Sequence, residues 1–142
     1  FEEPKFSDEY YALYQHYINT RHADGDMHPP SEEQFTSFLC QPNPACRSYF
    51  ICFRAAEKLI AVAVVDMLPK GVSAIYTFFD PQYSIRSLGQ LAVLWQISWA
   101  KKQSLSYVYL GYWIKNCQKM SYKADYQPLE VFNDLIWQPL EP

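Results

Sequence analysis

Glycine is scarce in this 142-residue sequence, with four residues, whereas proline contributes ten. A glycine-rich loop that cradles phosphates therefore has little material to form from. Charged residues make up only 19% of the chain and apolar residues 49%, a balance that excludes an intrinsically disordered protein. The length is sufficient for one domain and short for two, so we expect a single domain over residues 1–142.

The sequence also lacks segments that direct a chain into or across a membrane. No basic stretch followed by an apolar stretch begins at Phe1, so no signal peptide is predicted. The longest nearly apolar run, residues 88–100, is too short and too polar to cross a bilayer. We therefore expect a cytoplasmic location.

The four cysteines do not have the spacing of a metal or redox site. Cys40, Cys46 and Cys52 follow one another at six-residue intervals, unlike a C-x-x-C pair, and Cys117 stands apart. The three histidines show the same interval, which places them on different faces of a helix. We expect no metal and no other cofactor, and free thiols as in a reducing compartment. A disulfide between Cys40 and Cys46 is the alternative.

Positive charge is concentrated in the middle of the chain. Residues 67–125 carry seven basic and two acidic residues, whereas residues 1–66 carry five basic and ten acidic residues. The net charge of −3 by itself argues against a nucleic-acid partner, but a local basic surface is suited to contacts with phosphates. An ordinary solvated surface is the alternative.

Apolar periodicity and turn residues predict the order of helices and strands. Ser7 is placed to cap a first helix that ends near Arg21, and Ser31 with Gln34 forms a capping box for a second helix. A turn at residues 68–71 predicts that the two strands around it form a hairpin. The expected helices cover residues 7–22, 31–39 and 87–103, the expected strands cover 47–54, 59–67, 72–79, 105–112 and 131–137, and a turn or short helix covers 119–123.

This order predicts an α+β (α/β) domain with a mixed, mostly antiparallel sheet flanked by helices. Two strands, a helix and a further strand around residue 90 are arranged as in the GNAT acyltransferases. In that fold the sheet splays where a strand meets the following helix, and an acyl donor enters the gap. The analogy concerns the fold and leaves the function open.

Titratable residues are concentrated between the first expected helix and the prolines that follow it. Arg21, His22, Asp24 and Asp26 lie within six residues, with Gly25 between the two acids. The carboxylates are suited to orient an ammonium or accept its proton, and the two basic side chains are suited to a carboxylate or phosphate. An ordinary helix-terminal turn, with both acids in Asx-type turns, is the alternative.

A second segment joins an expected strand to the helix at residues 87–103. Arg86, Ser87 and Gly89 lie at the start of that helix, where unpaired backbone amides bind phosphate or carboxylate. The spacing Arg86-x-x-Gly89 matches the first part of the pyrophosphate loop of CoA-dependent acetyltransferases, but Leu91 stands where that loop has a second small residue. Ordinary capping by Ser87 with a close-packed Gly89 is the alternative.

Aromatic and basic residues are interleaved after the expected strand at 105–112. Tyr112 and Trp113 are followed by Lys119, Tyr122 and Lys123. Rings stack on bases or on a terminal adenosine, and lysines neutralise a nucleic-acid backbone. The alternative is that the rings belong to the core and the lysines are solvated.

Three stretches together resemble the aminoacyl-tRNA–protein transferase family, which includes eukaryotic arginyltransferases and bacterial aspartate/glutamate leucyltransferases. They are YINTRHADGDM at 17–27, FFDPQYSIRSLG at 78–89 and YVYLGYWIKNCQKMSYK at 107–123, the last followed by YQPLE at 126–130. The RHxDGDM form and the compact size are closer to the bacterial branch. The resemblance implies that residues 1–142 are the GNAT-like C-terminal catalytic domain of a longer protein, without the family's upstream, cysteine-bearing domain.

The resemblance further implies a reaction. An amino acid, leucine in the bacterial branch, passes from aminoacyl-tRNA as co-substrate to the N-terminal α-amine of proteins that begin with Asp or Glu. The product enters the N-degron pathway of protein degradation, in which a protease adaptor acts downstream. Arginyl transfer in the same reaction, a CoA-dependent N-acetyltransferase and a non-catalytic module that binds tRNA or acidic N-termini are the alternatives.

Each candidate residue has an expected role in that reaction. Asp24 or Asp26 holds or deprotonates the acceptor amine, and Arg21 or Arg86 pairs with the acceptor's side-chain carboxylate. His22 joins Arg21 as an anion-binding group. The helix start at Ser87 to Gly89 meets the end of the donor, Lys119 and Lys123 bind phosphates, and the aminoacyl or adenosine pocket is lined by Tyr112, Trp113 and Tyr122.

Overall fold

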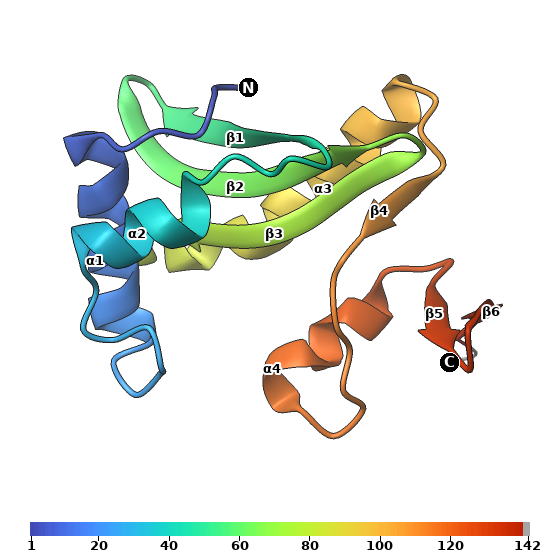
Figure 1. The fold of residues 1–142 in the computed structure, drawn as a ribbon. Helices are drawn as coiled ribbons and strands as arrows, with labels where there is room; N and C mark the ends of the chain where they lie inside the picture. Colours follow the sequence, from blue (N-terminus) through green and yellow to red (C-terminus); the bar gives the residue numbers. More distant parts are fainter. Residues whose placement is uncertain (141–142) are drawn as a thin grey trace. The chain divides into compact units, whose positions relative to one another are not determined.

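The structure, a computed structural model, describes residues 1–140, which form parts of two compact units (Figure 1). The first unit, residues 1–109, contains all of the larger helices and strands. Its elements are α1 (Asp8–Arg21), α2 (Glu32–Leu39), β1 (Arg47–Ala55), β2 (Lys58–Leu68), β3 (Gly71–Phe79), the 3-10 helix η1 (Pro81–Arg86), α3 (Leu88–Lys102) and β4 (Tyr107–Tyr109). The second unit contains α4 (Gln118–Ser121), the 3-10 helix η2 (Tyr122–Asp125), β5 (Glu130–Asn133) and β6 (Ile136–Pro139).

The first unit is a sheet covered by helices on both faces. Strands β1, β2 and β3 are antiparallel neighbours, and β4 pairs with β3 in parallel after the crossover through α3. In Figure 1, α2 lies in front of the sheet and α3 behind it. The expected α+β class, with a mixed and mostly antiparallel sheet flanked by helices, is confirmed.

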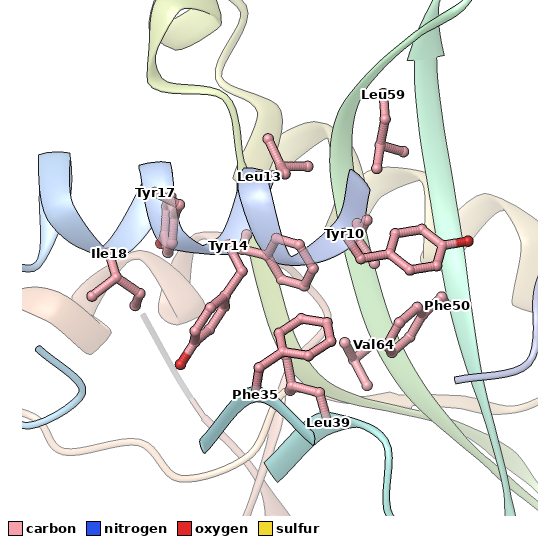
Figure 2. Close-up of a cluster of buried hydrophobic side chains, with 12 residues drawn as sticks. Tyr10, Leu13, Tyr14, Tyr17, Ile18, Phe35, Leu39, Phe50, Leu59 and Val64 are labelled. Atoms are coloured by element: carbon pink, nitrogen blue, oxygen red, sulfur yellow. The ribbon is translucent and has the colours of Figure 1, made fainter. Parts of the chain in front are cut away.

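Aromatic rings fill the core between the sheet and the helices α1 and α2. Tyr14 and Phe35 are fully buried, and their ring centroids are 5.3 Å apart in an edge-to-face arrangement (Figure 2). Phe78 of β3 meets the Tyr14 ring edge-to-face at 5.7 Å. The high aromatic content of the sequence is therefore used mainly to pack α1 and α2 on the sheet.

A bulge in β3 changes which face of the sheet its side chains occupy. Val65 pairs with Ala74 and Val64 pairs with Tyr76, so Ile75 is an extra residue without a partner on β2. Before the bulge, Val72 packs in the core on the α3 side. After the bulge, Tyr76 and Phe78 pack against the α1 side, although regular alternation would leave all of these even-numbered residues on one face.

Strands β3 and β4 stay together over three residue pairs only, from Gly71 with Tyr107 to Ser73 with Tyr109. The close approach requires the glycine, because a Cβ at Gly71 would lie 2.4 Å from the Tyr107 carbonyl oxygen. Beyond this point β3 continues to Phe79 while β4 has ended. The expected strand at 105–112 was therefore too long.

The expected helices and the three antiparallel strands are confirmed within one or two residues. Ser7 Oγ accepts from the Tyr10 amide at 3.2 Å, as predicted for a cap. Ser31 Oγ likewise accepts from the Gln34 amide at 3.1 Å. The Gln34 side chain, however, accepts from the Tyr14 hydroxyl at 2.9 Å, an interaction that ties α2 to α1.

The single strand expected at 131–137 is wrong. Residues 130–139 instead form a hairpin of β5 and β6, closed by Asp134 and Leu135 at φ values of 50° and 66°. Two consecutive positive φ values are typical of a tight hairpin turn, and a non-glycine pair there gives a weak sequence signal. The expected turn or short helix at 119–123 is confirmed by α4 and η2.

The described part of the chain, residues 1–140, has no helix long and apolar enough to pass through a membrane.

Phe35 is fully buried among aromatic rings, whereas Phe38 of the same helix is 45% exposed. We expect Phe35→Ala to lower the free energy of unfolding by about 3–5 kcal/mol, because it leaves a cavity in a packed core. Phe38→Ala is the matched control, with an expected loss of about 1 kcal/mol or less. Equilibrium urea unfolding measures both, and equal losses would contradict the assignment of Phe35 to the core.

Candidate functional site

A buried carboxylate ends β3 and begins the turn that leads to α3. Asp80 is 4% exposed, Lys58 Nζ donates to it at 2.7 Å, and the Gln82 amide donates to it at 2.9 Å. The His16 ring nitrogen lies 3.8 Å from the same carboxylate. Burial by itself raises the pKa of Asp80, but the Lys58 and Gln82 interactions outweigh it and hold the pKa below its ordinary value. Asp80 is therefore a charged anchor for the η1 turn.

The start of α3 is open. Ser87 has a left-handed conformation, with φ 47° and ψ 52°, and its side chain makes no capping bond to the helix. Such a conformation costs a non-glycine residue about 1 kcal/mol or more. A Cβ at Gly89 would meet Phe79 Cε1 at 3.7 Å, an ordinary contact, so packing does not require this glycine. The structure contradicts ordinary capping by Ser87 with a close-packed Gly89, and leaves the first-turn amides without a side-chain cap.

The Phe79 ring joins two of the segments singled out in the sequence. The Arg21 guanidinium carbon lies 5.3 Å from the centroid of this ring, and the Tyr17 ring lies 4.9 Å away. Gly89 lies near the same ring, as the position of its hypothetical Cβ shows. Arg21 and Gly89 therefore both lie near the Phe79 ring, although 68 residues separate them in the chain. Phe79 is not among the candidate residues predicted from the sequence, although it lies within the stretch FFDPQYSIRSLG that resembles the family.

The turn after α1 is held by its backbone. The His22 amide donates to the Ile18 carbonyl at 2.9 Å, and the Gly25 amide donates to the His22 carbonyl at 3.0 Å. The His22 Nε2 atom lies 3.0 Å from the Tyr17 hydroxyl. Asp24 and Asp26 are exposed, and across residues 1–140 neither carboxylate makes a hydrogen bond or ion pair. The Asx-type turns of the alternative interpretation are not formed, and both carboxylates are accessible to a ligand.

Arg86 extends from the η1 turn over a tyrosine ring. Its guanidinium carbon lies 5.5 Å from the centroid of Tyr83, and Lys58 Nζ lies 5.2 Å from the same centroid. The Arg86 side chain is exposed. The first unit thus contains seven of the twelve candidate residues: Arg21, His22, Asp24, Asp26, Arg86, Ser87 and Gly89.

The other five candidates belong to the second unit, where Lys123 organises the loop before α4. Lys123 Nζ donates to the Tyr112 carbonyl at 2.6 Å, and burial lowers the pKa of its ammonium. Gly111 precedes this contact at φ 77°, a conformation that favours glycine. Two of the three Lys123 donors are left for a ligand.

The rings of the second unit are not a closed core. Tyr112 is 89% exposed, so the alternative interpretation that its ring belongs to the core is wrong. Trp113 is half-buried, and its indole N–H has no acceptor among residues 1–140. Burial raises the pKa of the Tyr122 hydroxyl. Lys119 is exposed on α4, so this lysine and the Tyr112 ring are both accessible to solvent.

The four cysteines are free thiols. Within residues 1–140, no three His, Cys, Asp or Glu side chains are grouped so that they could hold a metal ion. An uncapped helix start, a guanidinium and accessible carboxylates are groups suited to the transfer of an activated group to an amine.

Comparison with known proteins identifies the class. The family described as "Arginine-tRNA-protein transferase, C terminus" matches residues 9–133, which is most of the chain. The chain belongs to this family of tRNA-dependent protein transferases.

Curated relatives give a narrower likeness. An "Aspartate/glutamate leucyltransferase" of Pseudomonas putida strain W619 is 55% identical over 137 residues, covering 96% of this chain and 57% of the relative. A protein of the same name in Pseudomonas fluorescens strain SBW25 is 54% identical, covering 97% of this chain and 58% of the relative. Another in Pseudomonas paraeruginosa strain PA7 is 52% identical, covering 98% of this chain and 58% of the relative. The chain thus spans little more than half the length of these relatives.

Lys58→Met is expected to destabilise the protein more at pH 7 than at pH 3. With Lys58 present, the lowered pKa of Asp80 contributes stability above the unfolded value near 4, and this is lost as the pH falls through the folded pKa. Without Lys58, burial raises that pKa, so the ionised carboxylate is penalised at neutral pH. Urea unfolding at both pH values measures the difference, with Lys70→Met as an exposed control. An equal loss at pH 7 and pH 3 would refute the ion-pair argument.

Proposed function

We propose that this chain is the C-terminal catalytic domain of a longer enzyme. The proposed enzyme transfers leucine from leucyl-tRNA to the N-terminal α-amine of proteins that begin with Asp or Glu. The family match and the name shared by relatives 52–55% identical support this function. The family's description as a C terminus and the 57% coverage of a relative support a longer protein. The proposed setting is the cytoplasm, and the proposed product is a substrate of the N-degron pathway.

The observation that carries the proposal is that Arg21 and Gly89, at the start of α3, both lie near the Phe79 ring. A guanidinium pairs with the carboxylate of an acceptor that begins with Asp or Glu. The uncapped amides of α3 stabilise negative charge, either on the terminal phosphate of the donor or on the oxyanion of the reaction. Arg21 and the α3 amides thus provide one group for the acceptor and one for the donor.

The protein has to supply only positioning and a general base for this reaction. The acceptor's amine attacks the ester carbonyl of leucyl-tRNA, a tetrahedral oxyanion forms, and the C–O bond breaks as the ribose hydroxyl leaves with a proton. A peptide bond replaces the ester, and the amine's proton passes to a base. An α-amine has a pKa of about 8, so roughly a tenth is neutral at pH 7. Positioning therefore supplies much of the rate, and a general base adds about 10²–10⁴.

Asp24 and Asp26 are the proposed partners of the amine. Both carboxylates are exposed and unpaired within the described residues, on the turn that directly follows Arg21 and His22. A carboxylate here orients the ammonium form and accepts its proton. His22, whose ring contacts Tyr17, is a further anion-binding group beside them.

The second unit is the proposed contact for the tRNA. Lys119 and Lys123 neutralise phosphates, and the exposed Tyr112 ring stacks on a base. Trp113 and Tyr122 line the pocket for adenosine or the aminoacyl group in this proposal, with Arg86 as a further cation near the start of α3. The unpaired indole N–H of Trp113 supports this role, since within residues 1–140 it lacks an acceptor.

The proposed activity predicts a defined pair of substrates. With the protein carrying its natural flanking sequence, we expect label from leucyl-tRNA to enter peptides that begin with Asp or Glu, and not peptides that begin with Ala or Lys. Scintillation counting of the peptide product measures this. Transfer from arginyl-tRNA instead would assign the arginyl reaction, and no transfer from either donor by folded protein would refute the proposal.

Replacing both carboxylates of the turn tests their role. We expect Asp24→Asn with Asp26→Asn to lower kcat by about 10²–10⁴ and to leave binding of leucyl-tRNA unchanged. Glu33→Gln, an exposed acid on α2, is the matched control with an unchanged rate. Single-turnover transfer and filter binding measure the two quantities. A full transfer rate in the double variant would exclude both residues as base or amine ligand.

A further inference from the structure

The edge of β3 is open over residues 74–79. On one side these residues, except Ile75 at the bulge, pair with β2. On the other side β4 has already ended at Tyr109, and no strand among residues 1–140 pairs there. The backbone N–H and C=O groups that face this side are therefore free for another chain. Figure 1 shows β3 continuing past the end of β4.

This edge has one feature that protects a free strand, the bulge at Ile75, but it has no lysine, proline or charged residue. Exposed edges are blunted by lysine, by proline or by charged residues that point inward. The edge sequence here is AIYTFF, without a charge or a proline, and Ile75 at the bulge is 41% exposed. Beyond the bulge, the uncharged edge of residues 76–79 is a template for pairing with an extended peptide.

We propose that the first residues of the acceptor protein bind as an added strand along residues 74–79 of β3. This inference rests on the proposed function, because that reaction brings a flexible polypeptide terminus to the first unit. The alternating donors and acceptors of a strand edge match a polypeptide backbone of any sequence. Affinity then comes from the main chain, which suits an enzyme whose substrates share only their first residue.

The charge at one end of the edge sets the direction of the added strand. Arg21 lies over the ring of Phe79, the last residue of β3, and within residues 1–140 it has no carboxylate partner. A guanidinium over an aromatic face keeps its N–H donors available in its plane. The acceptor's Asp or Glu side chain pairs with Arg21, so its N-terminus lies at Phe79.

The same placement brings the reacting amine to the start of α3. Gly89 lies near the Phe79 ring on which Arg21 lies, since a Cβ at Gly89 would be 3.7 Å from Phe79 Cε1. The following acceptor residues run from Phe79 back towards Ala74, so the added strand is antiparallel to β3. Only the first side chain meets a charged protein group, and Arg21 is a specificity-determining residue in this arrangement.

Single N-methylation along an acceptor peptide tests the added strand without changing the protein. In an antiparallel pair, every second residue of the peptide donates its amide to the neighbouring strand. We expect methylation of these amides in a fluorescein-labelled Asp peptide to weaken binding about tenfold or more, and methylation of the alternate amides to change it less than about twofold. Fluorescence anisotropy with the full-length protein, without tRNA, measures the dissociation constants.

Two protein variants separate the main-chain and side-chain contributions. Arg21→Gln is expected to abolish the preference for Asp over Ala at the first position and to keep the alternating pattern. Lys101→Gln, an exposed cation at the end of α3, is the matched control and binds every peptide as the wild type does. Circular dichroism verifies that both variants are folded.

The outcomes distinguish this inference from the proposed function. Alternation in binding without leucyl transfer supports the added strand and refutes the transferase. If leucine is transferred but methylation does not change peptide binding, or weakens it equally at every position, the added strand is refuted. The edge is then available to the aminoacyl end of the donor. Equal binding of Asp and Ala peptides by the wild type overturns the role of Arg21.

Discussion

The ion pair of Lys58 with the buried Asp80 determines where β3 ends and in which direction the chain leaves it. Because Asp80 also accepts the Gln82 amide, the η1 turn begins at a fixed point, and Ser87 is held in a left-handed conformation at its end. The start of α3 thus has amides without a side-chain cap at a defined position after the turn. A buried charge costs stability unless it is paired, so this anchor depends on both of its partners.

The bulge at Ile75 links the core to the functional surface. It lets Val72 pack under α3 while Phe78, farther along the strand, packs with Tyr14 of α1. Phe79, the next residue, then meets Tyr17 and Arg21 at the other end of α1. One strand therefore serves the core on both faces and carries the ring around which the proposed site is built.

The open edge of β3 and the uncapped start of α3 both fit the proposed function. Short pairing with β4 leaves the edge free, and the left-handed Ser87 leaves the helix start free. Both features lack the protection that a purely structural role would favour, since edges and helix starts are normally covered or capped. A transferase that joins a peptide terminus to an activated ester needs access for two polymers, and these are suitable places for their ends.

The sequence by itself determined the helices, the hairpin of β2 and β3 and the three stretches that resemble the family, because these are signalled by local periodicity, caps and contiguous residues. It did not determine the β5–β6 turn at Asp134 and Leu135, whose φ values come without a glycine. Only the tertiary structure decided that Arg21 and Gly89 share the Phe79 ring, that Ser87 does not cap α3, and that β3 keeps a free edge. These depend on contacts between residues far apart in the chain, which local patterns do not encode.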